Sequence, residues 1–163
     1  MKKQIIIING TGGSGKDTFV EFVSKYCKVF NFSSINKVKE VATVVGWNGT
    51  KTEKDRKFLS DLKKLTTEYN DMAFNSIKKA VEDFKKSNNE IMFIHIREPE
   101  EIKRAMNAFG AKTLLIKREG LETITSNYSD ANVEKYNYDY VVINTTLEQL
   151  DKEAKEFINR IKD

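Results

Sequence analysis

Apolar residues along this chain follow two patterns: short unbroken runs, and longer stretches with helical spacing. The unbroken runs predict strands that are buried on both faces, as in a parallel sheet. We expect five such strands, at residues 5–8, 29–33, 90–96, 113–116 and 140–143. Helical spacing recurs at residues 15–26, 35–45, 58–65, 69–84, 99–109 and 147–161. Strands that alternate with helices predict an α/β fold, in which a doubly wound parallel sheet carries helices on both faces.

A glycine-rich loop follows the first strand directly and leads into the first helix. The loop matches the pattern G-x-x-x-x-G-K-[ST] except at the last position, where Asp17 stands and Thr18 comes one residue late. In this arrangement loop amides and the positive helix end face an anion, while a lysine reaches the outer phosphates. The sequence therefore predicts a P-loop NTPase fold with strand order 2-3-1-4-5 and ATP as the bound nucleotide. The residues expected to bind ATP in this loop are Gly10, Gly12, Gly13, Ser14, Gly15, Lys16, Asp17 and Thr18.

The size and composition of the chain are those of one globular domain. With 163 residues, 39% hydrophobic and 32% charged, residues 1–163 suffice for a single domain built on five strands. No apolar run is long enough to cross a bilayer, and no signal-peptide pattern occurs, so we expect no membrane partner. A single cysteine, Cys27, suits a cytoplasmic protein. The net charge of +4 fits a small anionic substrate and is too diffuse to predict nucleic-acid binding. The oligomeric state stays open between monomer and homodimer.

Polar residues follow the strands at the edge of the sheet where such folds bind ligands. Lys16, Arg97 and Arg118 are the cations that we expect at the transferred phosphoryl group. For Arg97 the alternative is a surface ion pair with a neighbouring glutamate, and for Arg118 a role outside the site is equally open. Asn144 and Thr145, after the fifth strand, complete the expected nucleotide site.

The expected metal ligand is unusual. Asp17 stands where a hydroxyl is typical, and its carboxylate is predicted to bind Mg²⁺ directly or through water. The third strand lacks the terminal Asp of a Walker B motif, and His95, the only histidine, lies near that place. A hydrogen-bonded histidine at a strand end is the favoured interpretation, ahead of a catalytic role.

The absence of a carboxylate after the second strand narrows the chemical class of the acceptor. Transfer to an alcohol usually needs a carboxylate base, and none follows the second strand. A phosphate monoester needs no base, because its second pKa is about 6. We therefore expect a small-molecule phosphate monoester, held by Lys37, Arg56 and Arg97. A solvated helix face is the alternative for the first two. Residues 119–138 lose the apolar period and are predicted to form a lid.

Several segments together resemble the deoxynucleoside monophosphate kinases of phage and bacterial type. They are Ser14-Gly-Lys-Asp-Thr18, Phe32-Ser-Ser-Ile-Asn-Lys37, Gly46-Trp-Asn-Gly49 with Arg56 and Leu59, His95-Ile-Arg97, Asn127-Tyr-Ser-Asp130, and Tyr138 to Asn144 followed by Leu147. The resemblance implies phosphoryl transfer from ATP to a nucleoside or deoxynucleoside monophosphate. The chain departs from the family at 95, where the family has Asp, and at 127 and 130, where it has His and Glu. Two alternatives stay open: animal-type phosphomevalonate kinases, which share the Ser-Gly-Lys-Asp loop, and a nucleotide-binding protein without robust transferase activity.

Overall fold

A computed structural model describes residues 2–120 and 133–162 and contains a five-stranded parallel sheet. The strands lie in the order β2-β3-β1-β4-β5, which confirms the predicted α/β fold and strand order. Every neighbouring pair is parallel, so all carboxyl ends lie at one edge of the sheet. The strands are β1 (Gln4–Asn9), β2 (Val29–Ser33), β3 (Ile91–His95), β4 (Lys112–Arg118) and β5 (Tyr140–Asn144).

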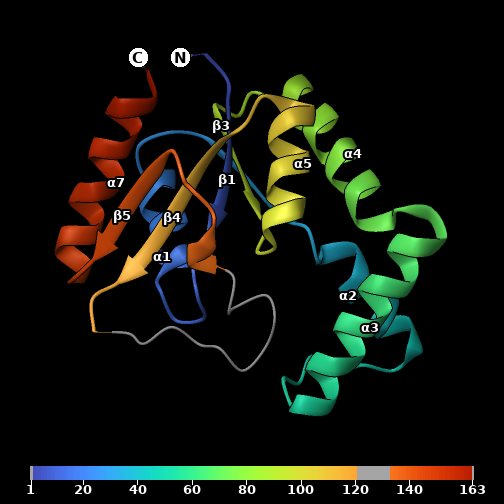
Figure 1. Cartoon of the computed structure of the whole chain (residues 1–163). Coiled ribbons are helices and arrows are strands. Elements are labelled where there is room, and N and C mark those ends of the chain that lie inside the picture. Colours follow the sequence, from blue (N-terminus) through green and yellow to red (C-terminus); the bar gives the residue numbers. More distant parts are fainter. Residues whose placement is uncertain (1, 121–132, 163) are drawn as a thin grey trace.

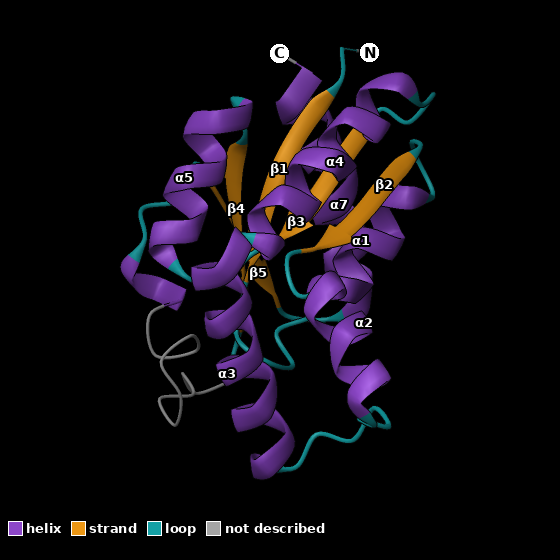
Figure 2. Ribbon diagram, turned by 90° about the vertical axis from the view of Figure 1, so that its right-hand side faces the viewer, coloured by secondary structure: helices purple, strands orange, loops and turns teal. Residues whose placement is uncertain are grey.

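Helices cover both faces of the sheet and bury two hydrophobic clusters (Figures 1 and 2). On one face α1 (Lys16–Ser24) and α7 (Leu147–Lys162) pack against the sheet, with Phe19, Phe93 and Phe157 in mutual ring contact. On the other face the second cluster is formed by α4 (Met72–Lys86) and α5 (Pro99–Phe109). Burial of these apolar side chains is the main driving force that holds the layers together.

Two further helices, α2 (Asn36–Val45) and α3 (Glu53–Asn70), extend beyond the carboxyl edge of the sheet (Figure 1). The end of α2 is set by Gly46, whose φ of 114° suits glycine. A capping box of Thr52 and Asp55 starts α3. None of the side chains of α3 is fully buried. α3 is therefore packed less tightly than the core, whereas α2 buries Val38 and Ala42.

Two predicted boundaries were wrong. Tyr69 was placed on the fourth helix, but it lies in the last turn of α3 and is 85% exposed, because Asp71 adopts a left-handed conformation (φ 57°) that separates α3 from α4. The fourth strand is longer than predicted and includes Lys117 and Arg118.

The predicted lid at 119–138 falls largely on residues 121–132, which lie outside the described residues. Of its remainder, residues Val133–Lys135 form a short 3-10 helix, η1, and Val133 is buried. The amide of Glu119 donates to the Asn144 carbonyl at 2.9 Å. Both described ends of the segment are thus bound to the sheet edge.

Across residues 2–120 and 133–162, no helix combines the length and the apolar character needed to cross a bilayer.

Candidate functional site

The glycine loop between β1 and α1 is packed too closely to accept side chains at two positions. A Cβ at Gly10 would lie 2.5 Å from Ser14 Oγ and 2.6 Å from the Ile116 carbonyl oxygen of β4. Gly15 precedes the first turn of α1 with φ 101°, and a Cβ there would lie 2.5 Å from Asn144 Nδ2. Glycine at these two positions therefore lets the loop pack closely against β4 and β5.

Side chains from distant strands hold this loop in shape. Asn144, at the end of β5, donates from Nδ2 to the Ser14 carbonyl at 3.0 Å, and the Ser14 amide donates to the Thr11 carbonyl at 3.1 Å. The Asn144 side chain thus supports the loop by binding the backbone of Ser14, whereas Thr145 is exposed. Ser14 Oγ is buried and has no hydrogen-bond partner within residues 2–120 and 133–162. A buried hydroxyl of this kind calls for a partner, and a bound phosphate oxygen would satisfy it.

The first turn of α1 carries the remaining expected nucleotide ligands. Lys16 is half-buried, Asp17 is exposed and Thr18 is half-buried. The residues of this loop fit ATP: a glycine cradle, an unsatisfied hydroxyl, a lysine and the positive end of a helix. Asp17 offers the hard carboxylate oxygen that Mg²⁺ prefers. In the described part of the chain no group of three or more metal-binding side chains occurs, so a metal ion at Asp17 would take its other ligands from phosphates and water.

A fully buried side-chain amide joins β1, β3 and the segment before β5. Asn9 Oδ1 accepts from the Gly10 amide at 2.9 Å, while Nδ2 donates to the Arg97 carbonyl at 3.0 Å and to the Tyr138 hydroxyl at 2.9 Å. Tyr138 in turn donates to the Val133 carbonyl at 2.6 Å. The amide thereby fixes the start of the glycine loop relative to the residue that carries one of the predicted cations.

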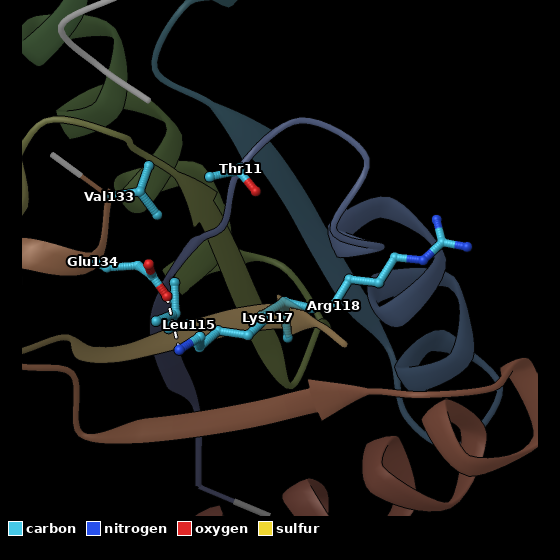
Figure 3. Close-up of a pocket in the computed structure, with 7 residues that line it drawn as sticks. Thr11, Leu115, Lys117, Arg118, Val133 and Glu134 are labelled. Atoms are coloured by element: carbon cyan, nitrogen blue, oxygen red, sulfur yellow. Dashed lines mark ion pairs between the residues drawn. The ribbon is translucent and has the colours of Figure 1, made fainter. Parts of the chain in front are cut away.

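Arg118, on β4, lies directly against the glycine loop. Its Nη1 donates to the Gly13 carbonyl at 3.3 Å. In Figure 3 its side chain points away from Lys117 and Glu134, which form an ion pair of 2.8 Å between β4 and η1. The sequence left two roles open for Arg118, and the structure brings it to the loop. Lys117, by contrast, fastens η1 to the sheet.

His95 ends β3 and is held as a neutral imidazole. Its Nε2 lies 2.7 Å from Asn31 Oδ1, an acceptor, so this nitrogen carries a proton. Burial, and next the positive charge of Lys16, lower the pKa of His95 to about 4. The imidazole is therefore uncharged near neutrality, next to the half-buried Lys16. This agrees with the predicted hydrogen-bonded histidine at a strand end.

Two of the three residues predicted to hold the acceptor lie on exposed helix surfaces. Lys37, on α2, pairs with Glu40 of the same helix at 3.0 Å, and Arg56 is exposed on α3. A solvated helix face therefore describes Lys37 in this structure, and its role in acceptor binding stays a prediction, as does that of Arg56. Arg97 follows β3, and its carbonyl is fixed by Asn9.

A cluster that the sequence did not indicate lies just beyond Arg97. Lys63 of α3 pairs with Glu101 of α5 at 2.8 Å, and Glu101 also shares a hydrogen bond with Glu98. Burial raises the pKa of Glu101, and the Lys63 ammonium opposes this rise. The cluster joins the projecting α3 to the core. Lys63 and Glu101 are 38 positions apart, and no local pattern marks such a pair.

Comparison with known proteins supports the fold and identifies no family. No protein-family model matches the chain, and no curated protein sequence matches it. Shikimate kinase from Aquifex aeolicus superposes with a TM-score of 0.54 at 15% identity over 98% of both chains. A putative kinase from Chloroflexus aurantiacus gives 0.54 at 9% identity, covering 98% of this chain and 97% of that one. Shikimate kinase from Bacteroides thetaiotaomicron gives 0.52 at 15% identity, over 98% and 99%. At these identities the similarity concerns architecture, and together with the strand order and the glycine loop it shows that this chain has the fold of the P-loop kinases.

Proposed function

We propose that this protein transfers the γ-phosphoryl group of ATP to a phosphate monoester, specifically a nucleoside or deoxynucleoside monophosphate. The observation that carries the proposal is the contact between Arg118 and the glycine loop at Gly13. It adds a second cation to Lys16 at the loop, and the backbone of Arg97 is fixed to the same loop through Asn9. Phosphoryl transfer depends mainly on such positioning and charge stabilisation.

In the proposed reaction the protein forms no covalent bond with either substrate. The bond between the γ-phosphorus and the bridging oxygen breaks, and a bond to an acceptor phosphate oxygen forms. Lys16 and Arg118 stabilise the charge that develops on the transferred group, and Arg97 holds the acceptor with the planar fork of its guanidinium. Asp17 would hold Mg²⁺, which when bound would offset the negative charge of the donor phosphates.

A phosphate monoester remains the favoured acceptor because no carboxylate directly follows β2, where an alcohol would need a base. A phosphate monoester has a second pKa of about 6, so it is already largely ionised near neutrality and needs no base. The resemblance in the turn at 46–49, a segment outside the loop that phosphomevalonate kinases share, supports a nucleoside monophosphate over other phosphate esters.

The test is an acceptor panel. Protein and Mg-ATP are incubated with each common nucleoside and deoxynucleoside monophosphate, and with phosphomevalonate, and formation of ADP is measured. ADP that appears only with a nucleotide acceptor supports the proposal. Turnover with phosphomevalonate alone would favour the small-molecule kinase. If no acceptor stimulates ADP formation, the transfer reaction is rejected in favour of nucleotide binding alone, the alternative that the replacement of the family's Asp by His95 supports.

Arg97→Lys separates acceptor binding from donor binding. The substitution keeps the charge but loses the planar fork, so we expect the acceptor KM to rise or kcat to fall by about 10-fold while the KM for ATP changes little. Arg160→Lys on α7, where Arg160 lies 3.9 Å from Glu156, is the matched control. An unchanged acceptor KM and kcat in Arg97→Lys would remove Arg97 from the acceptor site.

A further inference from the structure

The hydrogen bonds around Asn9 have a single consistent direction. The Val133 carbonyl can only accept, so the Tyr138 hydroxyl donates to it at 2.6 Å, and its oxygen accepts from Asn9 Nδ2 at 2.9 Å. The Gly10 amide can only donate, so it bonds to Asn9 Oδ1 at 2.9 Å. Both ends therefore require the same orientation of the Asn9 amide. Its two N–H groups are fully used, one by the Arg97 carbonyl and one by Tyr138.

Two members of this network are shielded from water, since Asn9 is fully buried and Val133 is 1% exposed, while Tyr138 is half-buried. Burial raises the pKa of the Tyr138 hydroxyl to about 12, so it remains protonated and able to donate throughout the neutral range. In such surroundings a lost partner is not readily replaced by solvent, and hydrogen bonds restrict side-chain orientation strongly.

The two backbone groups that Asn9 holds belong to different parts of the site. Gly10 opens the loop that would bind the donor, whereas Arg97 is the cation expected at the acceptor. Their relative position sets the distance over which a phosphoryl group must move. Displacements of about 1 Å can reduce the rate of such a step by about 100-fold.

We propose that Tyr138 is a positioning residue for phosphoryl transfer, which acts through Asn9 to hold the donor loop and Arg97 at the correct separation. This inference rests on the proposed function. It assigns a role to a residue outside the glycine loop and beyond the predicted cations. Tyr138 touches neither substrate; it restrains the amide that connects the two halves of the site.

The chain offers a matched pair of variants. Tyr138→Phe removes only the hydroxyl that joins Asn9 to Val133. Tyr136→Phe removes the hydroxyl of the adjacent ring, whose centroid lies 5.2 Å away and whose oxygen bonds to Met106 Sδ. Steady-state rates are normalised to the number of sites that bind an ATP analogue, so that loss of folded protein does not register as loss of kcat.

For Tyr138→Phe we expect kcat to fall by about 10-fold while both KM values change by less than about 2-fold, because positioning affects the transition state more than binding. Tyr136→Phe should keep all three constants within about 2-fold. In an Arg97→Ala background the Tyr138→Phe effect should largely vanish, since the two changes disrupt one connected unit. If Tyr138→Phe does not fold, 3-fluorotyrosine at 138 keeps the ring and hydroxyl but weakens the oxygen as an acceptor. We then expect a drop in kcat of about 2-fold with unchanged KM values.

An unchanged kcat per binding site in the Tyr138 variant, or an equal loss in Tyr136→Phe, would overturn the inference and leave the proposed function standing. Full additivity with Arg97→Ala would also overturn it. A wild-type protein that transfers phosphate to no acceptor would overturn both.

Discussion

Asp17 occupies the position where the glycine-loop pattern has Ser or Thr, and it lies exposed in the first turn of α1. If it is a Mg²⁺ ligand, Asp17→Asn should weaken Mg-ATP binding by about 10-fold or more and leave metal-free ATP binding nearly unchanged, because only the metal contact loses a full charge. Titration calorimetry with and without Mg²⁺ measures both affinities. Asp83→Asn, at an exposed position of α4, is the control. Equal losses in the two titrations would argue against the metal role.

His95 predicts how stability changes with pH. Its pKa is about 4 in the folded protein and 6.5 as a free side chain, so between these values the unfolded chain binds more protons. The free energy of unfolding should therefore be fully developed above pH 6.5 and decrease as the pH falls from 6.5 to 4. His95→Gln keeps a donor for Asn31 but cannot titrate.

Denaturant unfolding of both proteins at several pH values tests this. We expect the wild-type protein to lose more stability than His95→Gln between pH 6.5 and 4. Glu101, whose pKa is raised, acts in the opposite direction from pH 4.5 upward, but it is present in both proteins and cancels in the difference. Parallel pH profiles would show that His95 is not a buried neutral group.

Asn9 and Tyr138 show why part of the site escaped sequence reasoning. The glycine loop could be predicted because its requirements are local: glycines, a lysine and the start of a helix within nine residues, 10–18. Asn9 and Tyr138 are 129 positions apart, and Lys63 and Glu101 are 38 apart. Their contacts depend on how strands and helices come together, and no periodicity marks them. A polar Asn at the end of an apolar strand was the only available signal.

The boundary between α3 and α4 illustrates the same limit for helices. Apolar spacing placed Tyr69 on the second of them, but Asp71 ends the first with a left-handed residue. Arg104 of α5 holds Asp71 through two hydrogen bonds. Hydrophobic periodicity reports which face of a helix is buried, while its end here depends on a partner 33 positions away.

Packing predicts different exchange behaviour for these two helices. α3 has no fully buried side chain, whereas α4 buries Ala73, Ile77, Ala80, Val81 and Phe84. Amide hydrogens of α3 should therefore exchange faster than those of α4 in the free protein. If the acceptor binds between the glycine loop and the projecting helices α2 and α3, a bisubstrate analogue should slow exchange in α2 and α3. Exchange in α4 should stay nearly unchanged. Exchange in α3 that does not respond to the analogue would place the acceptor elsewhere.

The architecture as a whole was the most predictable property. The apolar runs of β1, β3 and β4 are buried, whereas those of the edge strands β2 and β5 are only partly buried, and the helices between the strands favour parallel, right-handed connections. The structure confirms the predicted sheet and its strand order. The same constraints do not identify the acceptor, because function in such folds depends on a few side chains at the carboxyl edge.

Binding at that edge should be measurable as stability of the entire protein. A ligand that binds only the folded state adds about 2.7 kcal/mol at 100 times its Kd, which for a chain of this size corresponds to roughly 5–10 °C in Tm. We expect this rise with Mg²⁺ and a non-hydrolysable ATP analogue. Lys16→Ala should abolish most of the rise while the ligand-free Tm stays within a few degrees of wild type, because Lys16 is only half-buried and lies outside both hydrophobic clusters. Differential scanning fluorimetry at several ligand concentrations gives both quantities. A Lys16→Ala protein with an undiminished shift would mean that the glycine loop is not the site of nucleotide binding, and the proposed transfer reaction would lose its donor.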